Sequence, residues 1–114
     1  MRKFLLAMMA LLFSGGAAHA HAYLDHANPR VGSTVRTAPR SVTLSFSQKL
    51  EPSFSSAQVT NASGARVDQG SRVSGMQIHV SVKSLPPGSY RVHWRVLSVD
   101  THTTEGNFSF RVGQ

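Results

Sequence analysis

The chain has 114 residues, a formal net charge of +7 and no cysteine, so it can build neither a disulfide nor a thiolate metal site. This length allows one domain with a small hydrophobic core. The basic residues are spread singly along the sequence rather than clustered, which argues against a nucleic-acid-binding protein. The excess of positive charge is then expected to form a solvated surface.

The first 20 residues have the three-part layout of a secretory signal peptide. Arg2 and Lys3 supply a positive start, an apolar run covers residues 4–13, and small residues follow. The run is too short to cross a bilayer, since spanning takes about 20 apolar residues. We therefore expect residues 1–20 to be removed and residues 21–114 to form a single exported domain of 94 residues with a net charge of +5.

The cleavage position is open, because two overlapping small-residue signals occur. Ala18-x-Ala20 predicts a cut before His21, whereas Ala20-x-Ala22 predicts a cut before Tyr23. The choice decides whether the mature chain begins with a histidine.

Beyond residue 40 the chain alternates apolar and polar residues in short runs, which is typical of β-strands with one buried face. Turn residues separate the runs, as in Asn61–Gly64 and Leu85–Ser89. Six or seven strands at this spacing predict an all-β fold, either a small Greek-key β-barrel or a β-sandwich. The predicted strands are Ser41–Phe46, Ala57–Thr60, Ala65–Asp68, Met76–Val82, Tyr90–Val96 and Phe108–Val112.

The same alternation sorts several side chains between core and surface. Trp94, whose neighbours two positions away are both valines, is predicted to lie in the core. His79 and His93 are predicted on outward faces, as ordinary solvated residues. His26 falls in an N-terminal loop and could face either way.

His102 differs from these histidines because Asp100 precedes it by two positions. On an extended backbone the two side chains would lie on the same side, about 7 Å apart at Cα, and could converge on one ion. The segment follows the Trp94 strand, near the end of a sheet, where binding residues are often held. The alternative is an ordinary aspartate–histidine pair in a surface loop.

His21 would strengthen a metal site if it were the first residue of the mature chain. A terminal histidine offers its free amine and its ring nitrogen to one metal. With Asp100 and His102, this gives three nitrogens and one oxygen, which suit Cu(II), although Zn(II) accepts the same donors. Cu(I) is disfavoured, because its soft sulfur ligands are nearly absent after residue 20.

The mature chain resembles the CopC family of periplasmic copper-resistance proteins along most of its length. Three sets of residues carry the resemblance: His21-Ala22-Tyr23-Leu24-x-x-Ala27-x-Pro29-x-x-Gly32-Ser33 at the start, Val42-x-Leu44-x-Phe46-Ser47 in the middle, and Gly88-x-Tyr90-x-Val92-x-Trp94-x-Val96-x-Ser98-x-Asp100-x-His102-x-x-x-Gly106-x-x-x-Phe110-x-Val112 at the end.

The resemblance implies a small Greek-key β-barrel of cupredoxin-like or immunoglobulin-like shape. It also implies cleavage before His21 and one Cu(II) held by His21, Asp100 and His102. The implied role is periplasmic copper homeostasis or resistance without catalysis, with an inner-membrane protein of the CopD type as partner.

Two features depart from the family pattern. Some members have a methionine-rich loop that binds Cu(I), but residues 61–76 here contain only Met76, so a second, Cu(I), site is not expected. Many members have an acidic residue just after the Phe-Ser of the early strand, where this chain has Gln48. Glu51 follows three residues later and could approach the same site.

Two other functions remain open from the sequence. The chain could be a metal-free β-sandwich interaction module, because a fold does not define a function. It could also be an oxidative copper enzyme of the polysaccharide monooxygenase type, whose metal is bound by an N-terminal histidine and a second histidine. That function is disfavoured, because Asp100 would fill a position that oxygen chemistry needs open, and 94 residues leave little room for a substrate platform.

Overall fold

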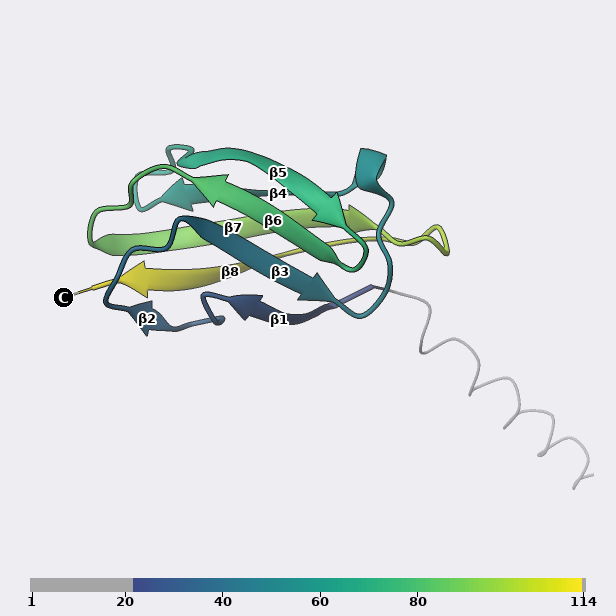
Figure 1. The fold of residues 1–114 in the computed structure, drawn as a ribbon, viewed down its shortest axis with the longest axis horizontal. Coiled ribbons are helices and arrows are strands. Elements are labelled where there is room, and N and C mark those ends of the chain that lie inside the picture. Colours follow the sequence, from purple (N-terminus) through teal and green to yellow (C-terminus); the bar gives the residue numbers. More distant parts are fainter. Residues whose placement is uncertain (1–21, 114) are drawn as a thin grey trace, which may run out of the picture.

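The computed structural model describes residues 22–113, which form two four-stranded β-sheets packed face to face (Figure 1). The first sheet has the order β1-β3-β6-β5, and the second has the order β2-β8-β7-β4. Neighbouring strands are antiparallel except β2 and β8. The elements are β1 Leu24–Asn28, β2 Thr34–Val35, β3 Ser41–Phe46, the 3₁₀ turn η1 Pro52–Phe54, β4 Ser56–Asn61, β5 Asp68–Ser74, β6 Gln77–Val82, β7 Gly88–Leu97 and β8 Thr103–Val112.

The all-β prediction is confirmed, and the fold is a two-sheet sandwich. The alternating residues of β3, β6, β7 and β8 turn their apolar sides inward, so the two sheets share one core. Trp94 lies in that core, as predicted, with its ring edge-on to Phe46 at a centroid distance of 5.1 Å. Full burial of one valine, leucine, isoleucine or phenylalanine side chain contributes about 1.5–3 kcal/mol. Because many such side chains are buried between the sheets, the shared core supplies most of the stability.

The strand boundaries were predicted well where alternation is strong. β3 matches the predicted segment, β4, β6 and β7 match within three residues at either end, and β8 begins five residues earlier than predicted. His79 and His93 lie half-buried on the outer faces of their sheets, as the alternation indicated.

One predicted strand is wrong, and three strands, β1, β2 and β5, were missed. Residues 65–67 make only an isolated bridge from Arg66 to Thr60, and the strand after this turn is β5, which begins at Asp68. β5 has mostly exposed residues and no alternation, so the pattern could not indicate it. β1 and β2 were missed because they bury few side chains. Ala27 is the one buried residue in these two strands.

The sandwich has two distinct ends. At the near end the chain enters at Ala22, and the segment 47–51, the turn 75–76 and the loop 98–102 lie together. At the far end lie the turns around residues 36–40, 62–67 and 83–87. Within residues 22–113, no helix is long and apolar enough to cross a membrane.

Candidate metal centre

The loop between β7 and β8 at the near end carries Asp100 and His102. It closes as a tight turn, because the Ser98 N–H donates to the His102 carbonyl at 3.0 Å and the Thr101 N–H donates to the Ser98 carbonyl at 2.9 Å. Thr101 has a φ of +74°, a left-handed conformation that threonine rarely adopts. The expectation of an extended backbone at this position is therefore wrong.

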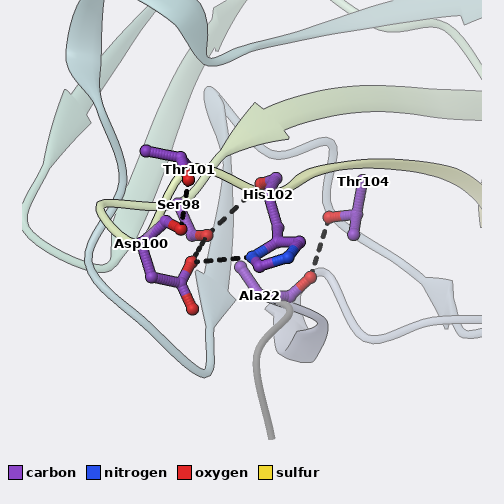
Figure 2. A network of polar contacts seen from close by, with 6 residues as sticks. All are labelled: Ala22, Ser98, Asp100, Thr101, His102 and Thr104. Carbon is purple, nitrogen blue, oxygen red and sulfur yellow. Dashed lines mark hydrogen bonds and ion pairs between the residues drawn. The ribbon is translucent and has the colours of Figure 1, made fainter. Parts of the chain in front are cut away.

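The turn nevertheless brings the two predicted side chains together. The His102 Nδ1 atom lies 3.7 Å from an Asp100 carboxylate oxygen. A dashed line marks this ion pair in Figure 2. Their side chains are 44% and 38% exposed, so both are accessible to solvent. An exposed ring nitrogen beside an exposed carboxylate is a suitable pair of ligands for Cu(II) or Zn(II).

Ser98 fixes the position and charge of Asp100. Its side chain is fully buried, and its hydroxyl donates to the Asp100 carboxylate (Figure 2). This hydrogen bond, followed by the charge of His102, holds the pKa of Asp100 below its usual range. The lowered pKa favours the ionised carboxylate, which is the state in which a carboxylate binds a metal.

The start of the described chain lies beside this pair. Ala22 is fully buried, and its carbonyl accepts a hydrogen bond from the Thr104 hydroxyl at 2.8 Å (Figure 2). Tyr23 then pairs with Ser47 through two hydrogen bonds of 3.0 Å, one in each direction. The backbone is therefore held against the start of β8 at its first described residue.

The third predicted ligand, His21, lies outside the described residues. In residues 22–113 no group of three histidine, aspartate or glutamate side chains could hold a metal ion. Asp100 and His102 are thus a pair of candidate ligands that the described part of the chain does not complete.

Core packing and backbone pairing fix the region around the β7–β8 loop. Trp94 faces Gly106 across β7 and β8, and a Cβ at Gly106 would lie 2.6 Å from the indole ring. Leu50 bridges to Ser98, and the Val99 N–H donates to the Lys49 carbonyl at 3.1 Å, which ties the loop to the segment 47–51. The loop that carries Asp100 and His102 is therefore anchored to the core and to the segment 47–51.

Sequence reasoning missed Ser98 and Thr104. A signal existed for Ser98, because it continues the inward series of Trp94 and Val96 and is a polar residue at a core position, two residues before Asp100. No pattern in the sequence indicates Thr104, because its partner is 82 positions away.

The remaining candidate residues are distributed around the molecule. Gln48 is half-buried in the segment that bonds to the loop, and the Glu51 N–H donates to the Leu97 carbonyl at 2.8 Å. His26 is exposed on β1 and lies 3.4 Å from Asp25. His93 lies on the outer face of the second sheet, 3.5 Å from Glu105.

Known proteins are similar to this chain in sequence and in fold. The family profile described as the CopC domain matches residues 24–113. The chain is 33% identical over 115 residues to protein YobA of Escherichia coli K12, covering 96% of this chain and 93% of that protein. It is 35% identical over 115 residues to copper resistance protein C of Xanthomonas campestris pv. juglandis, covering 92% and 90%.

The crystal structure of CopC from Methylosinus trichosporium OB3b has a TM-score of 0.77 to this chain at 32% identity, covering 82% of this chain and 94% of that one. Copper resistance protein C is named for copper resistance, which makes the family a copper-related one. The match over residues 24–113, together with these relatives, shows that the chain belongs to the CopC family.

Proposed function

We propose that the exported chain binds one Cu(II) ion at the near end through His21, Asp100 and His102, and buffers it or passes it on. In this proposal residues 1–20 are a signal peptide, cleavage before His21 frees its amine, and residues 21–114 work in the periplasm. The metal is then bound by the terminal amine, two imidazoles and one carboxylate, a set that suits Cu(II).

One observation carries the proposal. Ala22, to which His21 is covalently joined, is buried, and its carbonyl is held by Thr104 at the start of β8, two positions after His102. A ligand from the start of the mature chain would therefore have a short path to the exposed pair. The donors are nitrogen and oxygen only, which supports Cu(II) over Cu(I) as the bound state.

The same end offers a surface for a membrane partner of the CopD type. Tyr23 and Val99 are exposed apolar side chains on segments that adjoin the candidate centre. Because copper passes directly between ligands, a partner has to contact the surface around the metal. Tyr23 and Val99 are therefore the residues of this end that we propose for contact with such a partner.

The test is a Cu(II) titration of two matched forms, one starting at His21 and one with a single glycine placed before it. The first should bind one equivalent, and the second should bind more weakly by over about 100-fold, a larger loss than changes outside the ligand shell cause. The extension converts the chelating amine into an amide and leaves every described residue unchanged.

Asp100→Ala and His102→Ala should each cause a loss of similar size, whereas His26→Ala, at an exposed histidine of β1 that pairs with Asp25, should leave the affinity unchanged. Intact mass of the exported protein gives the cleavage position. A mature chain that starts at Tyr23, or an extended form with full affinity, would contradict the proposed ligand set.

A further inference from the structure

Charge is segregated between the two ends of the sandwich. The near end carries four carboxylates and three basic residues, whereas the far end carries six basic residues and one carboxylate. Arg30 lies in the segment between β1 and β2, at neither end. The near-end residues are Asp25, Glu51, Asp100, Glu105, Lys49, Arg72 and Arg95. The far-end residues are Arg36, Arg40, Arg66, Lys83, Arg91, Arg111 and Asp68.

Backbone pairing brings these basic residues to one end from distant parts of the chain. The Arg40 carbonyl accepts from the Val82 N–H at 3.1 Å, and the Lys83 N–H donates to the Val67 carbonyl at 2.9 Å. Arg91 and Arg111 lie on the parts of β7 and β8 nearest to this end. All six basic side chains are exposed.

Most of this charge is not neutralised within the described chain. Asp68 is the single carboxylate of residues 22–113 at the far end, and Arg66 holds it through two contacts of 2.8 Å. The other five basic residues therefore present uncompensated charge to the solvent. The net positive charge of the mature chain comes largely from this end.

The arrangement fits an extended anionic surface better than a small anion. A site for one phosphate needs several donors that converge on it. The hollow at this end, lined by Thr60, Ser89, Arg91 and Ser109 among others, contains one arginine only. The other five basic residues of the far end lie on separate turns and strands. This spread suits electrostatic contact with a broad anionic surface.

We propose that the far end docks on the surface of a bilayer that contains anionic lipids. The docking uses charge alone and does not depend on copper binding. It points the near end, with Asp100 and His102, away from the lipid. If the proposed function holds, copper is then exchanged with the extracytoplasmic part of a partner rather than at the lipid surface.

Two double variants with the same net charge test this proposal in the full mature chain. Arg40→Gln/Lys83→Gln removes two charges from the far end, and Lys49→Gln/Arg95→Gln removes two from the near end. Binding is measured by co-sedimentation with vesicles of phosphatidylglycerol and phosphatidylcholine, with pure phosphatidylcholine vesicles as the uncharged control. Each basic residue near an anionic surface contributes about 1 kcal/mol, so the far-end variant should bind about 30-fold more weakly.

The parent chain should bind the anionic vesicles, release them at about 1 M salt, where screening acts within about 3 Å, and ignore pure phosphatidylcholine. The near-end variant should stay within about threefold of the parent, since its lost charges lie far from the lipid. Equal losses in the two variants would overturn the proposal, because net charge rather than the far end would then govern binding. A parent chain that does not bind anionic vesicles would overturn the proposal as well. This holds also if that chain binds soluble polyphosphate.

Cu(II) titration of the parent chain and of the far-end variant separates this proposal from the proposed function. Vesicle binding without copper binding leaves the docking proposal standing and removes the copper site. Copper binding without vesicle binding does the reverse.

Discussion

Asp68 is expected to be the carboxylate on which the acid stability of the described fold depends most. Its side chain is only 2% exposed, and its oxygens accept from the Val59 N–H at 3.0 Å and from Arg66 Nε and Nη2 at 2.8 Å each. The bonds from Arg66, then the one from Val59, lower the pKa of Asp68 from 3.8 to about 2. These contacts hold the turn after β4 against the start of β5.

The shift converts into a stability that depends on pH. Because the pKa of Asp68 is lower in the folded state, its contribution is fully present above pH 4 and is lost as the pH falls through about 2. A shift of almost two units corresponds to about 2 kcal/mol. Solvent screening of Arg66, whose side chain is 60% exposed, makes this an upper estimate.

Asp68→Asn should therefore lower the free energy of unfolding by at most about 2 kcal/mol at pH 7 and by less than about 1 kcal/mol at pH 2. Urea unfolding of the two proteins across this range measures the difference directly. Asp25→Asn, which removes a carboxylate that is 62% exposed, serves as the control and should show no such trend. Two parallel stability curves for the parent and Asp68→Asn would refute the reasoning.

Three further predictions concern the candidate centre. Ser98→Ala removes the first cause of the lowered Asp100 pKa, so that pKa should rise in an NMR titration, and Cu(II) affinity should fall about tenfold, more at pH 5 than at pH 7. Thr104→Val removes the hydroxyl that holds the Ala22 carbonyl, and it should weaken Cu(II) binding about tenfold in a titration while the β7–β8 loop keeps its NMR shifts. Met76→Ala should change neither Cu(II) affinity nor the unfolding midpoint appreciably, because Met76 is a half-exposed residue in the turn 75–76; a clear loss of affinity would assign it a role as a ligand.

Alternation indicated the parts of the fold in which one face of a strand is buried. β3 and β7 carry strict apolar series and were predicted almost to the residue. β5 is held by pairing with β6 and presents polar residues on both sides, so backbone hydrogen bonds rather than side-chain burial define it. Periodicity carries no information about such a strand.

The candidate centre shows a similar division. The spacing of Asp100 and His102 indicated a pair of ligands, but the reason given for their approach was wrong. A tight turn with a left-handed Thr101, rather than an extended strand, brings them together. The turn depends on Ser98, whose burial results from packing between the sheets and cannot be read from the loop alone.

The Asp100–His102 pair is a local feature of one loop, whereas the contact between Ala22 and Thr104 depends on the whole fold. Two side chains that are about 40% exposed make a weak site by themselves, and in residues 22–113 no third histidine or carboxylate joins them. The packing of Ala22 against Thr104 connects the beginning of the sequence to the start of β8. A chain lacking this contact could keep the same aspartate–histidine turn and still have a freely moving N-terminus. The affinity of the proposed centre should therefore depend on the cleavage position as much as on the loop that carries Asp100 and His102, and to a smaller degree on Thr104.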